Sequence, residues 1–190
     1  MTPDEVLRIL EAAGAVRRGH FLLTSGRHSD LFVLCAQVLQ YPEQAARLAG
    51  AMAEPYARTR IDVVIGPAVG GIILAHEVAR RLGARAVFAE KGGAEGMVLR
   101  RGFVLRRGER VLAVEDALTT GGSLRRVLEL VRAAEAEIVG ASVLVDRSGG
   151  RLDLGVPVRA LLTLDVKAWE PEHCPLCRAG VALIEPKEPV

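Results

Sequence analysis

Asparagine is absent from this chain, and aromatic residues make up only 4% of its 190 positions. The missing amide side chains fit the depletion of thermolabile residues in proteins from hot environments, although a GC-rich coding bias would also favour the arginine that outnumbers lysine here. Scarce aromatics and a formal net charge of only +2 leave neither a stacking platform nor a basic footprint for nucleic acid. A small molecule is therefore the expected partner.

Long hydrophobic runs are missing as well. No segment reaches the roughly 18 uncharged apolar residues that a membrane span requires. The first ten residues, MTPDEVLRIL, lack the basic start and apolar stretch of a signal peptide. We therefore expect a cytoplasmic protein with no membrane partner.

Cysteine is scarce, and the three thiols cannot form a complete set of disulfides. Two of them lie in HCPLC, where Cys174 and Cys177 form a C-x-x-C pair. A tetrahedral zinc site needs four ligands, and Cys35 is the one further thiol. We favour a local turn of buried thiols over a metal site, so no protein-held metal is expected.

The composition is otherwise that of a globular domain, with 50% hydrophobic and 25% charged residues. Short apolar runs typical of buried parallel strands cover residues 61–66, 84–89, 111–114, 137–146 and 160–165. Helices are predicted for residues 3–13, 42–56 and 70–82 and after Ser123. Such alternation predicts a single α/β domain with a parallel sheet, helices on both faces, and a ligand site at the carboxyl ends of the strands.

Two further segments have their own patterns. FLLTSGRHSDLFVL, residues 21–34, predicts two extended pieces joined by a polar loop at residues 24–30. The glycine-rich residues 91–96 contain nothing apolar enough to anchor them, so this stretch is expected to be mobile.

VEDALTTGGS, residues 114–123, carries the chemistry. It follows an apolar strand and precedes a helix, so its glycine-rich end offers unpaired N–H groups and a positive dipole end to a phosphate. No G-K-[ST] follows the glycines and the G-x-G-x-x-G spacing is missing, which disfavours nucleoside triphosphatases and dinucleotide enzymes. Glu115 and Asp116 precede the loop where ribose hydroxyls would lie, and carboxylates accept hydrogen bonds from hydroxyls. The pattern predicts a site for ribose 5-phosphate.

An apolar strand followed by two acids, two variable residues and T-T-G-G-S resembles the phosphoribosyl pyrophosphate motif of the type I phosphoribosyltransferases. The alternative is a strand-to-helix turn without a ligand. The resemblance implies that family's parallel-sheet fold. It also implies that phosphoribosyl pyrophosphate is held by Glu115, Asp116, Ala117, Leu118, Thr119, Thr120, Gly121, Gly122 and Ser123.

Two segments are similar to orotate phosphoribosyltransferases in particular. FLLTSGRHSDLF resembles the F-x-L-x-S-G-x-x-S segment that covers the pyrimidine, so residues 1–40 are expected to contribute to a base-covering hood and residues 168–190 to form a C-terminal appendage. VDRSGG, residues 145–150, resembles the segment whose arginine meets orotate, and arginine suits a planar carboxylate. A surface ion pair is the alternative for that arginine, and His28 is expected to be a polar surface residue. The implied orotate contacts are Ser25, Gly26, Arg27, Phe32, Thr119 and Arg147.

GPAVGG follows the strand at residues 61–66, so its amides could hold pyrophosphate. An ordinary strand-to-helix connection without a ligand would have the same glycine and proline pattern. The residues concerned are Gly66, Pro67, Ala68, Val69 and Gly70. Many relatives carry a lysine where this chain has Val69 and Gly70.

Lys91 is one of three lysines among 25 basic residues, and FAEKGG resembles the strand end that precedes a flexible catalytic loop in the family. Beyond Lys91 this loop offers only Glu95, and the next cations are Arg100 and Arg101, so which cation serves the loop stays open. A solvated basic hairpin is an equal interpretation for Arg100, Arg101, Arg106 and Arg107.

The resemblance implies transfer of ribose 5-phosphate from phosphoribosyl pyrophosphate to orotate, with Lys91, Glu115, Asp116, Arg100 and Arg101 at the reacting centre. Mg²⁺ is the implied cofactor, held mostly by substrate oxygens and water. A homodimer that shares the loop near Lys91 is also implied. A purine or uracil phosphoribosyltransferase and a non-catalytic regulator that senses phosphoribosyl pyrophosphate are the alternatives.

Overall fold

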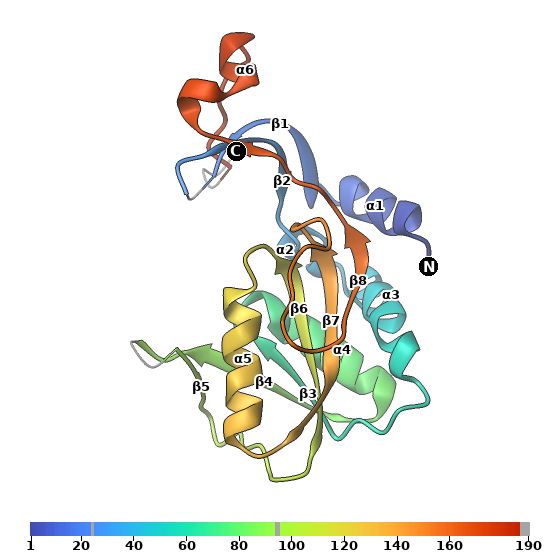
Figure 1. Ribbon diagram of the computed structural model, residues 1–190. Helices are drawn as coiled ribbons and strands as arrows, with labels where there is room; N and C mark the ends of the chain where they lie inside the picture. The colour runs from blue at the N-terminus through green and yellow to red at the C-terminus, as the bar shows by residue number, and fades with distance from the viewer. Residues whose placement is uncertain (24, 94–95, 187–190) are drawn as a thin grey trace.

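A six-stranded sheet forms the centre of the protein, and its strands follow the order β5-β4-β3-β6-β7-β8 in the computed structural model (Figure 1). The model describes residues 1–23, 25–93 and 96–186. Five of the strands are parallel, whereas β5 pairs antiparallel with β4 at the edge. The strands are β3 (Val63–Pro67), β4 (Arg85–Lys91), β5 (Met97–Leu99), β6 (Arg110–Leu118), β7 (Glu137–Asp146) and β8 (Val158–Thr163).

Helices cover both faces of this sheet, which confirms the predicted fold class. One face carries α3 and α4, and the other carries α5, so the protein has three layers (Figure 1). α4 ends at Gly83, whose φ of 69° is the left-handed conformation that glycine adopts without strain. The helices are α1 (Pro3–Ala12), α2 (Ala36–Leu39), α3 (Pro42–Ala53), α4 (Gly70–Leu82) and α5 (Gly122–Ala133), and α3 is followed by the 3₁₀ turn η1 (Glu54–Tyr56).

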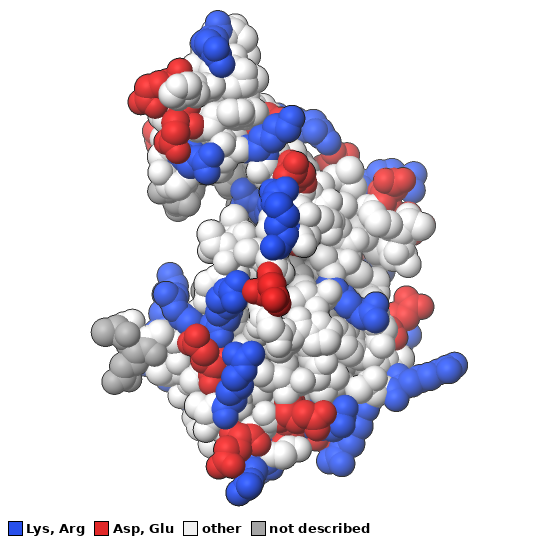
Figure 2. All heavy atoms as spheres, in the orientation of Figure 1, with Lys and Arg blue, Asp and Glu red and all other residues white. Residues whose placement is uncertain are grey.

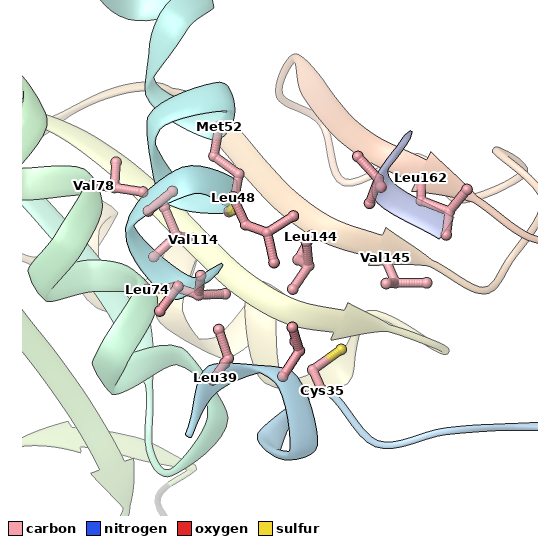
Figure 3. Packing of buried hydrophobic residues seen from close by; sticks show 14 of the residues in the cluster. Cys35, Leu39, Leu48, Met52, Leu74, Val78, Val114, Leu144, Val145 and Leu162 are labelled. Atoms are coloured by element: carbon pink, nitrogen blue, oxygen red, sulfur yellow. The ribbon is translucent and has the colours of Figure 1, made fainter. Parts of the chain in front are cut away.

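The two hydrophobic cores follow from the pleat of the strands. Successive side chains of a strand point to opposite faces, so Val111 and Ala113 of β6 pack under α5, while Leu112 and Val114 pack under α3 and α4. Figure 3 shows the second of these clusters, in which Leu48 of α3 meets the sheet. Parallel strands that are buried on both faces consist of continuous apolar runs, and for this reason they could be predicted from the sequence.

α1 begins as the sequence predicted. Thr2 Oγ1 accepts a hydrogen bond from the Glu5 amide at 3.3 Å, and the Glu5 side chain accepts one from the Thr2 amide at 2.7 Å. This capping box satisfies two N–H groups that a helix start leaves unpaired. The helix then buries Val6 and Leu10 in the α3 and α4 core.

A second unit, which we call the upper module, stands beyond the carboxyl ends of the parallel strands (Figure 1). It consists of an antiparallel sheet of order β1-β2-β9 and the C-terminal segment to residue 186. The Ile184 amide donates to His20 O at 2.8 Å, and the Leu22 amide donates to Ile184 O at 3.0 Å, so the two ends of the chain are joined. Its elements are β1 (Val16–Leu22), β2 (His28–Val33), β9 (Ala168–Trp169), the 3₁₀ turn η3 (Pro171–His173) and α6 (Pro175–Arg178).

Some boundaries differ from the prediction. β2 begins at His28, so the expected loop over residues 24–30 is shorter, because strand pairing with β1 extends to its first residue. β6 continues to Leu118, since pairing with β7 carries the strand through the two acids. The expected mobile stretch, residues 91–96, includes positions 94–95, which lie outside the described residues. No helix in the described part of the chain is long and apolar enough to cross a membrane.

Truncation of the core side chain Leu48, which is 0% exposed, tests the layer packing. Leu48→Ala should lower the free energy of unfolding by about 2–5 kcal/mol, because the cavity left behind collapses only in part. Urea denaturation followed by circular dichroism measures this change. Leu183→Ala, at a side chain 43% exposed, is the matched control and should change the stability by less than about 1 kcal/mol. Similar losses in both variants would contradict the assignment of the core.

Candidate active site

The order of the strands reverses between β3 and β6. β3 continues to β4 on one side, whereas β6 continues to β7 and β8 on the other. In open parallel sheets the crevice for a ligand forms where the strand order reverses, outside the carboxyl ends. The loops that leave β3 and β6 there are GPAVGG and EDALTTGGS, so the topology brings together the two phosphate-binding loops predicted from the sequence.

The loop after β6 is shaped for an anion. Gly121 precedes α5 with a φ of 77°, and no side chain caps the helix. The first N–H groups of α5 are therefore available to a phosphate. Leu154 lies against Gly121, where an added Cβ would approach it to 3.0 Å, so a larger residue would be both strained and crowded. A small hollow here is lined by Glu115, Ala117, Leu118, Thr119, Thr120, Gly121, Gly122 and Ser123.

The two acids are largely withdrawn from water. Burial, followed by the neighbouring Asp116, raises the pKa of Glu115 to about 8. Burial also raises the pKa of Asp116, although its Oδ1 accepts a hydrogen bond from the Ala117 amide at 2.9 Å. At neutral pH Glu115 therefore carries a proton in the ligand-free protein, so the pair is not doubly ionised as the sequence suggested. A protonated Glu115 can donate as well as accept a hydrogen bond.

The loop after β3 lies directly against these acids. A Cβ on Gly70 would overlap the carboxylate of Asp116, and a Cβ on Gly66 would meet Gly71 O at 2.5 Å. Only glycine at these positions lets the loop turn this tightly beside the acid. Val69 is 81% exposed where a lysine was expected from the family, and the peptide bond before it is cis.

Lys91 ends β4 on the same edge of the sheet. Its side chain is exposed, and no ion pair involves it among the described residues. Arg101 Nε, by contrast, donates to Glu90 Oε1 at 2.6 Å, and its guanidinium lies 5.7 Å from the centre of the Phe88 ring. Arg100 is farther from Glu90, at 4.0 Å. These side chains border a pocket lined by Ala68, Val69, Ile72, Phe88, Glu90, Lys91 and Arg101.

Arg106 and Arg107 lie at the opposite edge of the sheet. They precede the first residue of β6, and they pair with Glu109 and Glu135 respectively. Since the candidate site lies at the carboxyl end of β6, the basic-hairpin interpretation holds for these two arginines.

Arg147 follows the last residue of β7 and flanks the motif, because its amide donates to Leu118 O at 2.8 Å. Its Nε is buried without a hydrogen-bond partner, and burial lowers the pKa of its guanidinium. The alternative, a surface ion pair of Arg147 with Asp146 or another neighbour, is not present among the described residues. The Asp146 carboxylate accepts instead from the amides of Ser148 at 2.7 Å and Gly150 at 3.1 Å, which closes the turn after β7.

The expected orotate contacts of the upper module lie in the turn between β1 and β2 and on β2. Ser25 and Gly26 are exposed, and Gly26 turns the chain with a φ of 81°. Arg27 is committed elsewhere, since it bonds Ala168 O and pairs with Glu170 at 3.1 Å. Phe32 packs on Phe21 with ring centres 5.6 Å apart. The upper module and the body are separated by a hollow in Figure 2.

Sequence reasoning missed several participants. Cys35 is buried at 1% exposure, and its thiol donates to Asp116 O at 3.4 Å, so it supports the motif from behind. Glu90 forms an ion pair with Arg101, and this role could not be predicted, because a single glutamate before a lysine matches no sequence motif. His28 was expected at the surface but is 5% exposed and lies beside His20 and the C-x-x-C pair.

The chain is similar to proteins of known family along nearly its whole length. The family model for the phosphoribosyl transferase domain matches residues 36–174. An orotate phosphoribosyltransferase of Caldanaerobacter subterraneus is 50% identical over 98% of this chain and 97% of its own length, and one of Pelotomaculum thermopropionicum is 52% identical over the same shares.

A solved structure, the orotate phosphoribosyltransferase of Aeropyrum pernix, superposes with a TM-score of 0.72 at 30% identity, covering 84% of this chain and 93% of that one. Sequence, fold and site geometry agree: the chain belongs to the phosphoribosyltransferase family and, within it, to the orotate phosphoribosyltransferases.

Proposed function

We propose that the loop after β6 binds the ribose 5-phosphate half of phosphoribosyl pyrophosphate and that its ribose is transferred to orotate, giving orotidine 5′-phosphate and pyrophosphate for pyrimidine biosynthesis. One observation carries this proposal. The buried Glu115 and the partly buried Asp116 lie a few residues before an uncapped helix start, at the point where the strand order reverses. The activity is the one named for relatives that are about half identical over nearly the full chain.

The two acids have distinct parts in this proposal. As the bond from C1′ to pyrophosphate breaks, positive charge develops on the sugar. Asp116 then faces that charge, while Glu115 with its proton fixes the vicinal hydroxyls by donating and accepting hydrogen bonds. Burial makes the interaction with Asp116 stronger than it would be in water.

The leaving pyrophosphate would be met from two sides. The amides of Gly70 and Gly71, at the uncapped start of α4, would hold it in the place that a lysine side chain strengthens in relatives, and Lys91 would supply the cation from β4. Arg101 is the second cation, oriented by Glu90. Arg100, which is only loosely placed near Glu90, can approach from the same turn.

Mg²⁺ fits this site, because the hard carboxylate oxygens of Asp116 lie where the two loops meet. When bound, it would neutralise charge on the pyrophosphate oxygens. The protein offers no closed cage of ligands there, so substrate oxygens and water would complete its coordination.

Orotate would lie between Arg147 and the turn of the upper module. The unpartnered Nε of Arg147 is a donor that a planar carboxylate can satisfy, and uracil has no such group. The backbone of residues 25–29 would close over the base from the far side of the hollow seen in Figure 2. A homodimer would add the loop after Lys91 to the partner's site.

Asp116→Asn should lower kcat by about 100-fold, because it removes a preorganised charge while keeping the shape of the side chain. Steady-state formation of orotidine 5′-phosphate measures this. The fold should persist, as seen by thermal unfolding, since a neutral group suits a buried position. Asp4→Asn, at an exposed position of α1, is the control and should retain full activity. A kcat for Asp116→Asn near that of the control would contradict the assigned role.

Arg147→Ala should raise the KM for orotate by roughly 10–100-fold, because paired hydrogen bonds to a carboxylate are lost. The KM for phosphoribosyl pyrophosphate should change by less than about twofold. Arg151→Ala removes an exposed arginine that pairs with Asp165 and should leave both constants unchanged.

The unaltered chain, assayed with Mg²⁺ and with orotate, uracil or hypoxanthine in turn, should turn over orotate alone. Turnover with hypoxanthine would favour a purine enzyme, and binding of phosphoribosyl pyrophosphate without any turnover would favour a regulator.

For the Arg147→Ala variant, an equal rise in the KM for orotate and in the KM for phosphoribosyl pyrophosphate would contradict the assignment of Arg147 to the base site.

Glu115 should leave a signature in the dependence of stability on pH. Its pKa is about 8 in the folded chain and about 4.5 in the unfolded one, so the folded state binds the proton more tightly. Stability from this group is fully present below pH about 4.5 and is lost as the pH rises through about 8. Glu115→Gln should therefore flatten the fall in unfolding free energy between these values, by on the order of a few kcal/mol. Urea denaturation at several pH values in this range measures the unfolding free energy, with Glu129→Gln, at an exposed position, as the control. If the unfolding free energies of both variants depended on pH in the same way, the raised pKa of Glu115 would be contradicted.

A further inference from the structure

Four side chains with metal-binding atoms converge in the upper module. They are His20 of β1, His28 at the start of β2, and Cys174 and Cys177 at the two ends of the C-x-x-C pair. All four ligand atoms lie within 4.8 Å of one another. Two come from the N-terminal hairpin and two from the C-terminal segment, which lie side by side in Figure 1.

The spacing of these atoms suits one tetrahedral ion. Zn–S bonds of about 2.3 Å and Zn–N bonds of about 2.0–2.1 Å place neighbouring ligand atoms roughly 3.3–3.8 Å apart. His20 Nε2 lies 3.0 Å from His28 Nδ1, 3.4 Å from Cys174 Sγ and 3.7 Å from Cys177 Sγ. Cys177 Sγ lies 3.2 Å from His28 Nδ1.

Hydrogen bonding among the four groups does not account for this arrangement. His20 Nδ1 lies 2.8 Å from Val181 O, and a carbonyl can only accept, so Nδ1 carries a proton and, in the neutral ring, Nε2 presents its lone pair. One lone pair then faces three neighbours. A histidine that gives its second N–H to a backbone carbonyl is also the usual arrangement of a metal ligand, because that bond fixes the ring and its tautomer.

The surroundings favour zinc in a structural role. His20 is 1% exposed, His28 5% and Cys174 0%. Two thiolates and two imidazoles in tetrahedral array are typical of zinc, and four protein ligands leave no open position for a substrate. Neither Cys174 nor Cys177 is in a disulfide.

The C-terminal segment of the upper module has little other source of stability. Val16, Leu31 and Val33 of β1 and β2 belong to the core cluster under α3 and α4, but no described residue after Val166 belongs to either core cluster or packs on it. Val181, Leu183 and Ile184 remain 44%, 43% and 39% exposed. A small unit with so little buried apolar surface usually depends on a metal or disulfides.

We propose that His20, His28, Cys174 and Cys177 bind a structural Zn²⁺ ion that joins the first hairpin of the chain to its C-terminal segment. Binding releases one proton from each thiol, so two thiolates neutralise the ion. The turn at residues 25–27 lies between the two histidine ligands, so the metal also fixes the segment that faces the candidate active site.

Metal analysis of the full chain, purified without chelators, tests this directly. About one zinc ion per chain is expected, and Co²⁺ in its place should give the visible absorption of tetrahedral thiolate coordination. His20→Ala, His28→Ala, Cys174→Ser and Cys177→Ser should each lower the bound zinc at least tenfold. His173→Ala and Cys35→Ser are matched controls that should keep it, although His173 adjoins Cys174 in the sequence.

If the variants fail to fold, thiol alkylation of the unaltered chain still tests whether Cys174 and Cys177 bind zinc. Zinc should protect Cys174 and Cys177, and a chelator should expose them while lowering the Tm. A chain without zinc that gives no Co²⁺ spectrum, or alkylation of both thiols at the same rate with and without a chelator, would overturn the proposal. So would a zinc loss in His173→Ala equal to that in His20→Ala. Because none of these measurements uses a substrate, their failure would leave the assigned reaction untouched.

Discussion

The approach of the Asp116 carboxylate to the Gly70 backbone is the constraint on which the site depends. It brings the end of β6 against the loop after β3, so that a sugar beside the acids and a pyrophosphate beside the amides would share one crevice. Two neighbouring parallel strands with helices that leave toward opposite faces create this crevice. Any side chain at Gly70 would separate the two loops, and the glycine is therefore part of the site although it carries no functional group.

Burial raises the pKa values of both acids and disfavours their charged forms, which lowers the stability of the fold when they are ionised. Desolvation and mutual repulsion hold a proton on Glu115, which a surface carboxylate would have lost at neutral pH. The same low-dielectric surroundings leave Arg147 Nε without a partner. Burial disfavours both the charged form of Glu115 and an unpartnered Arg147 Nε, and the proposed ligand, with its hydroxyls and carboxylate, would satisfy both groups.

Prediction from sequence succeeded where local pattern determines structure. Apolar runs located the parallel strands, and the Thr2 and Glu5 capping box located α1, because burial on both faces and helix capping depend on residues close in sequence. The TTGGS loop was found for the same reason. The Glu90 pairing with Arg101 and the contact of Cys35 with Asp116 could not be found in this way, since each joins residues brought together by strand order alone.

The histidines illustrate the limit most clearly. In the sequence, the histidine nearest to the C-x-x-C pair is His173, which is adjacent to Cys174. The fold instead brings His20 and His28 to the pair. His28 is separated from Cys177 by 149 residues in the sequence. No periodicity encodes that meeting. It results from antiparallel pairing of β2 with β9, which places the two ends of the chain in one sheet.

That closure of one end of the chain on the other sets an order of assembly. Residues 16–33 leave the ribosome early, yet β9 and the strand-like contact at Ile184 become available only after every strand of the six-stranded sheet has been made. The parallel sheet can form from residues 63–163 before then, because its strands and crossover helices lie within that interval. The upper module is thus completed later than the crevice, and a nascent chain halted before Ala168 would hold both loops of the candidate site while β2 still lacked its partner β9.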